Sequence, residues 1–303
     1  MPIPTTPRRT PEMAEKKIDP ATGVETTGHE WDGVTELNNP MPRWWVSIFY
    51  ATIVFAVIYT IFFPAWPLVE TATRGVLGYT ARGEVAEKVA AHKEMQSVWK
   101  DRIAAASMEE IREDPDLFNF ALASGAANFA VNCSQCHGAG AAGNVGGYPN
   151  LNDDAWIWGG DLENIRYTIT HGVRNEDDPD ARYSEMPRYG VDELLSAEEI
   201  EGAVQYVLNF TGRATDVELA ETVGAEVWEY NCSACHGENG GGGPMLGAPR
   251  LNDAIWLYGG EAEDIRAQIW KPRQGVMPAW GLILDDTTVK ELAVYVHSLG
   301  GGQ

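Results

Sequence analysis

The chain has 303 residues and a formal net charge of −22, from 22 basic and 44 acidic residues. Five of the basic and seven of the acidic residues precede residue 44, so the rest of the chain carries a net charge of −20. A field of this sign repels nucleic acid and attracts basic protein partners, so we exclude DNA and RNA binding. The length allows two domains of about 100 residues each, together with a tail.

The N-terminal segment is polar. Residues 1–28 contain many Pro, Thr and charged residues and few apolar ones. Such a composition buries too little apolar surface to offset the entropy of ordering, so we expect these residues to be flexible. They form most of a predicted cytoplasmic tail, residues 1–43.

A long apolar run follows the tail. Residues 44–63 are uncharged and mostly apolar, and 20 helical residues at about 1.5 Å each span the ~30 Å core of a bilayer. A cleaved signal peptide is the alternative, but its apolar core is shorter, at about 7–15 residues, and ends in a small-x-small site. We predict one transmembrane helix, residues 44–66. Aromatic residues suited to the membrane interface and helix-terminating prolines flank it: Trp44, Trp45, Trp66, Pro64 and Pro67.

The next segment, residues 67–113, is predicted to be a helical linker. Its central part, residues 82–106, is composed largely of strong helix formers. His92 lies within it, and we expect this side chain to be exposed on the helix surface.

The remaining sequence contains an internal repeat. Asn132-Cys133-Ser-Gln-Cys136-His137-Gly138 matches Asn231-Cys232-Ser-Ala-Cys235-His236-Gly237 at an offset of 99. The offset is 100 at the later matches, which pair Pro149 with Pro249, Trp156 with Trp256, Gly159 with Gly259 and Ile165 with Ile265. We therefore predict two homologous domains, residues 114–213 and 214–303.

Each repeat is predicted to begin and end with a helix. The first helix carries a glycine and an aromatic residue four positions apart, Gly125 and Phe129 in one copy and Gly224 and Trp228 in the other. Residues at this spacing share one helix face, and glycine lets another helix approach closely. We expect the first and last helices of each domain to cross there.

The last helices have recognisable starting signals. Ser196 and Glu199 form an S-x-x-E capping box in the first copy, and Asp285 precedes the helix in the second. Tyr206 and Tyr295 hold equivalent places in these helices. Strand signals are weak throughout, so the predicted fold class is all-α, with one N-terminal transmembrane helix followed by two tandem domains.

C-x-x-C-H is the sequence of a c-type haem attachment site. Two thiols one helical turn apart can each add to a vinyl group on one edge of the porphyrin, and the next residue then reaches the iron. We predict two covalently bound haem c groups, so the fold is predicted to be one N-terminal transmembrane helix followed by two tandem cytochrome c domains. The predicted covalent attachment residues are Cys133, Cys136, Cys232 and Cys235, and the proximal iron ligands are His137 and His236.

Three other uses of cysteine fit less well. A disulfide framework belongs to short secreted chains and does not place a histidine after every second cysteine. A zinc site of four thiolates requires neither those histidines nor two repeated domains. A thioredoxin-like motif needs a βαβ pattern, which neither copy has.

Each repeat also contains a Met-Pro pair in the loop before its last helix. A thioether favours ferrous iron, as in the Met/His ligation of cytochromes c. A single methionine is more often a core filler, but equivalent methionines in two haem domains favour ligation. We predict Met186 as the partner of His137 and Met277 as the partner of His236. His171 remains a competitor to Met186, although a histidine at a helix C-terminus before a Gly cap is its ordinary interpretation.

Other histidines and aromatic residues receive structural roles. We expect His297 to pack or to be exposed, and His29 precedes the membrane helix, on the opposite side from the haems. Four aromatic residues between the haem-attachment and methionine segments are predicted to pack against the porphyrins: Trp156, Trp158, Trp256 and Tyr258.

From residue 29 onwards the chain resembles the dihaem subunit of cbb3-type cytochrome c oxidases, called subunit P or subunit III. The most specific cue is the run from His29 to Trp45, HEWDGVTELNNPMPRWW, which leads into the membrane helix. The methionine contexts HGVRN…EMP and RQGVMPAWG extend the likeness to the C-terminus. Some members of this family have two membrane helices, whereas only one is evident here.

The resemblance implies a bacterial proton-pumping terminal oxidase. In such a complex this subunit accepts electrons from a donor cytochrome c, and they pass through a monohaem cytochrome c subunit to a haem–copper catalytic subunit that reduces O2. The chain itself is then a non-catalytic electron-transfer subunit, single-pass in the inner membrane, with its N-terminus cytoplasmic and its haem domains periplasmic. Two alternatives remain: a cytochrome subunit of a periplasmic dehydrogenase, and a free-standing dihaem electron shuttle.

Overall fold

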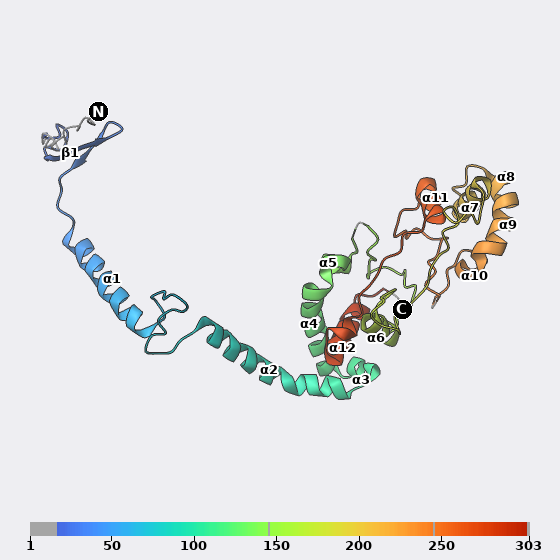
Figure 1. Ribbon diagram of the computed structural model, residues 1–303, viewed down its shortest axis with the longest axis horizontal. Coiled ribbons are helices and arrows are strands. Elements are labelled where there is room, and N and C mark those ends of the chain that lie inside the picture. The colour runs from blue at the N-terminus through green and yellow to red at the C-terminus, as the bar shows by residue number, and fades with distance from the viewer. Residues whose placement is uncertain (1–16, 145, 245, 302–303) are drawn as a thin grey trace, which may run out of the picture. The chain divides into compact units, whose positions relative to one another are not determined.

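The computed structural model describes residues 17–144, 146–244 and 246–301. These residues fall into two units, Met1–His92 and Lys93–Gln303. In the first unit, β1 (Thr26–Trp31) and β2 (Val34–Leu37) form an antiparallel hairpin, drawn near the N-terminus in Figure 1.

The hairpin corrects part of the predicted flexible tail. Residues 1–16 lie outside the described residues, but Ile18 already pairs with Glu25, and β1 begins within the segment predicted to be unstructured. The β1–β2 turn is made by Asp32 and Gly33, both with positive φ. An Asp-Gly turn of this kind is a strong hairpin signal, so the sequence contained the information.

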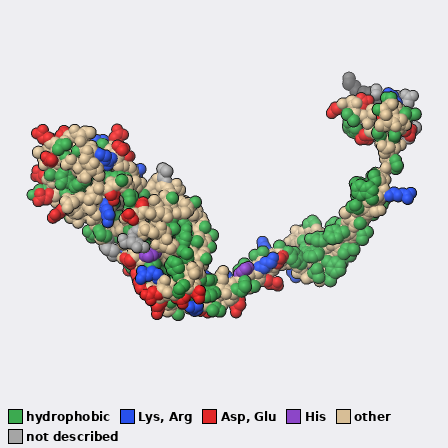
Figure 2. All heavy atoms as spheres, turned by 180° about the vertical axis from the view of Figure 1, so that it is seen from behind, with side chains coloured by type: hydrophobic (Ala, Val, Ile, Leu, Met, Phe, Trp, Pro, Cys, Tyr) green, Lys and Arg blue, Asp and Glu red, His purple; other side chains and the backbone are tan. Residues whose placement is uncertain are grey.

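The predicted membrane helix is confirmed as α1 (Arg43–Phe62), and no residue of it is buried. Its mean hydropathy reaches 2.0, and Figure 2 shows it covered with hydrophobic side chains. The hydroxyls of Ser47, Thr52 and Thr60 donate to helix carbonyls three or four residues earlier. These bonds satisfy the polar groups of the span internally, as a bilayer requires.

The end of α1 is capped by the chain that follows it. The backbone N–H groups of Val76 and Leu77 donate to the carbonyls of Ile61 and Phe62 at 2.9 and 3.2 Å. These carbonyls have no partner within the helix, so the returning loop satisfies them. A Cβ on Gly75 would come within 2.6 Å of the Phe62 carbonyl carbon, which explains the glycine there.

The linker is helical from residue 81 onwards, and residues 67–80 form a loop. α2 (Ala81–Ala105) and α3 (Met108–Glu113) follow the loop, and α3 starts at a capping box between Ser107 and Glu110. His92 is exposed on α2, as predicted.

Both predicted repeats consist of helices and loops. The elements of the first repeat are α4 (Pro115–Asn132), α5 (Ser134–His137), η1 (Ala139–Ala141), α6 (Leu162–His171) and α7 (Ala197–Asn209). Those of the second are α8 (Val217–Leu219), η2 (Ala220–Gly224), α9 (Ala225–Val227), η3 (Trp228–Cys232), α10 (Ser233–His236), α11 (Ala262–Trp270), η4 (Trp280–Leu282) and α12 (Asp286–Ser298). In the described residues, the run from α8 to η3 is one continuous helical stretch with two π turns.

The last helices are exchanged between the repeats, which corrects the expectation that each domain closes with its own. α12, from the second repeat, packs on α4 and α6 of the first, as the red and green ribbons of Figure 1 show. α7, from the first repeat, packs on η2, α9 and α11 of the second. The predicted crossing at a glycine does occur, but between different partners.

The two crossings are equivalent. A Cβ on Gly125 would clash with the carbonyl of Glu291 and lie 2.7 Å from the Cβ of Tyr295. A Cβ on Gly224 would clash with the carbonyl of Gly202 and lie 3.0 Å from the Cβ of Tyr206. Each glycine thus allows two backbones to approach more closely than any side chain would permit.

Two hydrophobic cores result, and each draws on both repeats. The buried residues of the first core are Ile103, Met108, Ile111, Leu117, Ala121, Phe129, Ala141, Leu162, Ile165, Ile169, Val289, Leu292, Ala293, Val294 and Val296. Those of the second core are Tyr189, Leu195, Ile200, Ala203, Val204, Val207, Leu208, Val227, Trp228, Ile265 and Ile269. The predicted boundaries at residues 113 and 213 stay predictions, but neither core lies within one repeat. The second core is built from residues 186–269, and the first from segments on both sides of that range.

Matching ion pairs also join the repeats. Arg166 on α6 pairs with Asp286 on α12 at 2.7 Å, and Arg266 on α11 pairs with Glu201 on α7 at 2.6 Å. The two arginines are equivalent in the repeat. These groups are partly exposed, so each pair contributes at most about 1 kcal/mol, and the apolar packing is the larger contribution.

Replacing Gly125 by Ala tests the first crossing. At an ordinary exposed helix position this change stabilises by up to about 1 kcal/mol. Here we expect a loss of about 1–3 kcal/mol, because the new methyl group forces α4 and α12 apart. Thermal unfolding of the detergent-purified chain, followed by circular dichroism, measures it. Ala127→Leu, at an exposed position of α4, is the control and should change stability by less than about 0.5 kcal/mol. A stabilised Gly125→Ala variant would contradict the close approach.

Candidate haem sites

The two C-x-x-C-H motifs form short helices at the ends of α4 and η3. Cys133 is half-buried and Cys136 exposed, and the same holds for Cys232 and Cys235; all four thiols are free. Burial raises the pKa of Cys133 and of Cys232 to about 11. Two cysteines one helical turn apart, neither of them in a disulfide, are placed to add across two vinyl groups on one edge of the porphyrin.

The histidine of each motif is held in one orientation. Nδ1 of His137 lies 3.1 Å from the carbonyl oxygen of Pro149, and Nδ1 of His236 lies 3.0 Å from that of Pro249. A carbonyl only accepts, so Nδ1 carries the proton and Nε2 presents its lone pair. Burial lowers the pKa of both histidines, which favours the neutral imidazole that binds iron.

Glycine makes the turn that brings each proline back to its histidine. Gly138 and Gly237 both have a φ of +78°. After the turn, the carbonyl of His137 accepts from Gly143 N–H, and that of His236 accepts from Gly242 N–H, both at 2.8 Å. A Cβ on Gly138 would lie 2.5 Å from the Gly143 carbonyl oxygen, so this position requires glycine.

An aromatic residue from the preceding helix backs each histidine. The ring centroids of Phe129 and His137 are 6.4 Å apart, and those of Trp228 and His236 are 6.2 Å apart. A tyrosine of the exchanged helix packs on the far side, with Tyr295 5.3 Å from Phe129 and Tyr206 5.4 Å from Trp228. The exchanged helices therefore contribute to both histidine environments.

Each predicted methionine ligand packs against the same core as the exchanged helix that comes after it in the chain. Met277 packs against the first core, which contains Phe129, and Met186 packs against the second, which contains Trp228. This differs from the pairing expected within each repeat. Both methionines are partly buried, so their thioethers lie at the margins of the cores.

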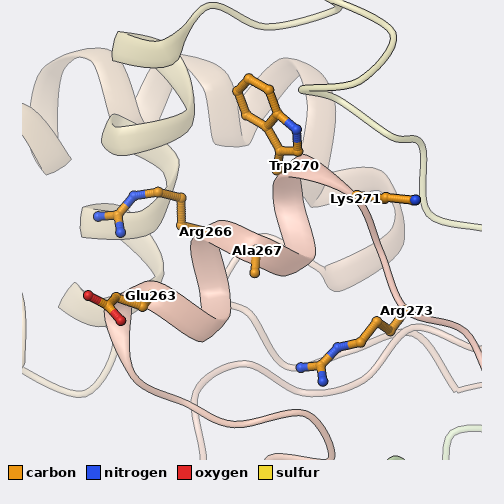
Figure 3. Close-up of a pocket in the computed structure, with 6 residues that line it drawn as sticks. All are labelled: Glu263, Arg266, Ala267, Trp270, Lys271 and Arg273. Carbon is orange, nitrogen blue, oxygen red and sulfur yellow. The ribbon is translucent and has the colours of Figure 1, made fainter.

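Backbone hydrogen bonds fix both methionine segments to the opposite repeat. Val173, just after α6, exchanges two bonds with Met277, at 2.9 and 3.0 Å. Gly190 and Val191, just after Met186, both donate to the carbonyl of Trp270 at the end of α11, at 3.2 Å. Figure 3 shows Trp270 at this end of α11, on the same helix as Arg266.

His171 has partners of its own. Its Nδ1 lies 3.0 Å from a carboxylate oxygen of Asp178, and its ring centroid lies 4.4 Å from that of Tyr167. It ends α6 and is followed by Gly172, which has a positive φ. The interpretation as a helix C-terminal histidine with a Gly cap fits this placement.

The four predicted haem-wall aromatics occupy two kinds of place. Trp156 packs against the first core and Trp256 against the second, and each indole N–H donates to a carbonyl three residues earlier. Trp158 and Tyr258 instead reach into the other repeat. A Cβ on Gly247 would meet Trp158, and one on Gly147 would meet Tyr258. These loops lead directly to the prolines that hold the histidines.

The donor sets fit haem c. The first cysteine of one C-x-x-C-H motif and a methionine on a segment fixed by backbone hydrogen bonds pack against each core, and the histidine of that motif has its Nε2 unprotonated. Soft sulfur and neutral imidazole are the axial ligands of cytochrome c iron. Sequence reasoning assigned no role to the Pro149 and Pro249 carbonyls, because a backbone acceptor has no residue signature. Their recurrence 12 and 13 residues after the histidines was the available signal.

Comparison with known proteins agrees with this architecture. A family model described as the N-terminal domain of cytochrome oxidase-cbb3, FixP, matches residues 23–70. A second, described as cytochrome c oxidase, cbb3-type, subunit III, matches residues 120–207 and 220–296. The chain belongs to this family. Its two cytochrome domains make it a dihaem electron-transfer subunit, and α1 anchors it in the membrane.

Relatives align over nearly the whole chain. The cbb3-type cytochrome c oxidase subunit FixP of Sinorhizobium medicae is 51% identical, covering 95% of this chain and 98% of the relative. Subunit CcoP of Cereibacter sphaeroides is 49% identical, covering 92% and 95%. Subunit FixPc of Rhizobium leguminosarum bv. viciae is 51% identical, covering 96% and 100%.

Proposed function

We propose that this chain accepts electrons from a donor cytochrome c and passes them towards the O2-reducing subunit of a cbb3-type cytochrome c oxidase. Its partners are then a monohaem cytochrome c subunit and a haem–copper catalytic subunit. The observation that carries the proposal is the pair of cytochrome donor sets in a chain whose described residues include one membrane helix. The relatives' names, which specify this oxidase, support it.

Both alternatives are less well supported. A dehydrogenase subunit or a free-standing shuttle would share the C-x-x-C-H repeats, but neither accounts for the N-terminal segment. Residues 23–70, which contain the hairpin and α1, match the family model specific to cbb3 oxidases. The hairpin before the membrane helix thus lies in a segment that matches the family model of this oxidase subunit.

The proposed iron ligands combine residues from both repeats. Cys133, Cys136 and His137 hold one haem with Met277, and Cys232, Cys235 and His236 hold the other with Met186. Bound haem supplies an iron that alternates between the ferric and ferrous states. The surrounding residues keep each imidazole neutral, aim its Nε2 and fix the methionine backbone. Packing of each methionine against the opposite core supports this pairing over the pairing within repeats.

Deleting one haem tests the ligand pairing. With Cys133→Ala and Cys136→Ala together, the purified chain should hold one haem instead of two. In this background Met186→Leu should abolish the remaining sulfur-to-iron charge-transfer band, and Met277→Leu should leave it intact. In the reciprocal background, Cys232→Ala with Cys235→Ala, the effects of the two methionine variants should be reversed. Pairing within each repeat predicts the opposite result in both backgrounds.

The proposed location is the bacterial inner membrane, with the N-terminus cytoplasmic and the haem domains periplasmic. The reason is chemical, since c-type haem is attached outside the cytoplasm. Charge gives little guidance, because near the span Arg43 precedes it while Arg74 and Arg82 follow it. A periplasm-dependent alkaline phosphatase fused after Gln303 should be active, and the same reporter fused before residue 17 should be inactive. Activity only in the second fusion would reverse the topology.

The acidic surface is proposed to recruit a basic donor. Residues 44–303 carry a net charge of −20. Acidic side chains are spread over the face seen in Figure 2 of the second unit, Lys93–Gln303, which is the haem-binding unit. Exposed charges are screened within about 8 Å at physiological ionic strength. The rate at which the purified oxidase oxidises a basic cytochrome c should therefore fall steeply as salt rises. A rate independent of ionic strength would mean that charge does not guide the donor.

A further inference from the structure

The guanidinium of Arg174 lies between the two methionine segments. Its Nε donates to the carbonyl of Gly275 at 2.8 Å, and its Nη1 donates to the carbonyl of Ser184 at 3.1 Å. Ser184 precedes Met186 by two residues, and Gly275 precedes Met277 by two. One side chain therefore holds both segments at the same position relative to their methionines.

The charged guanidinium of Arg174 donates hydrogen bonds to these two carbonyls and not to a carboxylate of the described residues. No ion pair within the described part of the chain includes this arginine. Burial lowers the pKa of Arg174, and the nearby Glu185 carboxylate acts in the opposite direction. A guanidinium remains protonated under such a shift, so a fixed positive charge lies beside both segments.

The backbone around Arg174 is held on two sides. Its N–H donates to the carbonyl of Arg182 at 2.7 Å, and its neighbour Val173 exchanges two bonds with Met277. Arg174 has a φ of +51°, which is uncommon for a residue with a Cβ and persists where the surroundings hold it. The guanidinium thus projects from a fixed point at the junction of the repeats.

We propose that Arg174 is a positioning residue that couples the axial-ligand segments of both haems. The inference rests on the proposed ligation by Met186 and Met277. Two forked N–H bonds hold the segments together, so a change at Arg174 acts on both thioethers. Its positive charge also favours the less positive ferrous state at both irons, which raises both midpoint potentials.

Three variants of the purified oxidase complex test the coupling. Arg174→Gln removes the charge, and we expect both charge-transfer bands to weaken and both midpoint potentials to fall. Arg174→Lys keeps the positive charge but loses the planar guanidinium that donates to both carbonyls. Compared with Arg174→Gln, its midpoint potentials should therefore lie closer to those of the wild type, while its charge-transfer bands should remain weakened. Arg188→Gln is the matched control: Arg188 lies two residues after Met186, pairs with Asp192 at 2.8 Å and is half exposed, so neither haem should change.

The two-cysteine deletions resolve the haems individually. A change confined to one haem, or no change at either, would overturn the coupling if Met186→Leu and Met277→Leu each still abolish one band. If those methionine variants leave both bands intact, the proposed ligation itself fails, and the coupling falls with it. If the Arg174→Gln variant does not incorporate haem, the Arg174→Lys variant is the deciding test. Wild-type bands and potentials at both haems in that variant, which lacks the planar guanidinium, would refute the positioning role.

Discussion

The contact on which the rest of the haem-binding unit depends is the close approach of helix backbones at Gly125 and Gly224. At each crossing a glycine faces the backbone carbonyl of a helix from the other repeat, Glu291 in one case and Gly202 in the other. Because no side chain fits there, the helices approach until the aromatic residues one turn away interlock. The same aromatic residues back the proximal histidines, so helix packing and imidazole position are set together.

Exchange of the last helices has a direct consequence for the ligand segments. Each methionine lies shortly before the helix that crosses over, so it is carried to the opposite core with that helix. The segments must then pass one another, and Val173, Arg174 and Trp270 bond to them where they do so. Neither core is complete without the other repeat, so the two haem environments belong to one folding unit.

The repeat symmetry is broken where the first core meets the linker. Lys290 and Glu291 of α12 are buried, whereas α7 has Glu201 and Gly202 at the equivalent places. Nζ of Lys290 donates to the carbonyls of Ile103, Ala104 and Ala106, at the C-terminal end of α2, where helix carbonyls need partners from outside the helix. Glu291 accepts from Ser124 at 2.6 Å, and its burial raises its pKa. Lys290 thus joins the end of α2 to the first haem core, and the second core has no such attachment among the described residues.

The sequence by itself determined the local chemistry and the elements. Cys133, Cys136 and His137, with their repeats, specify haem attachment by spacing within one helical turn, and the apolar run specifies α1 by length. Ser196 and Asp285 mark helix starts, because their side chains accept from the backbone N–H groups of Glu199 and Thr288. All of these depend on neighbours within a few residues. Only the tertiary structure decided which last helix closes which core. The helices that carry Gly125 and Gly224 can each pack against a last helix that carries a tyrosine. Because both last helices carry one, Tyr206 and Tyr295, the sequence pattern allows either pairing of helices. The choice is made by contacts between segments about 100 residues apart, such as Arg166 with Asp286 and Arg174 with Gly275, which no local pattern encodes.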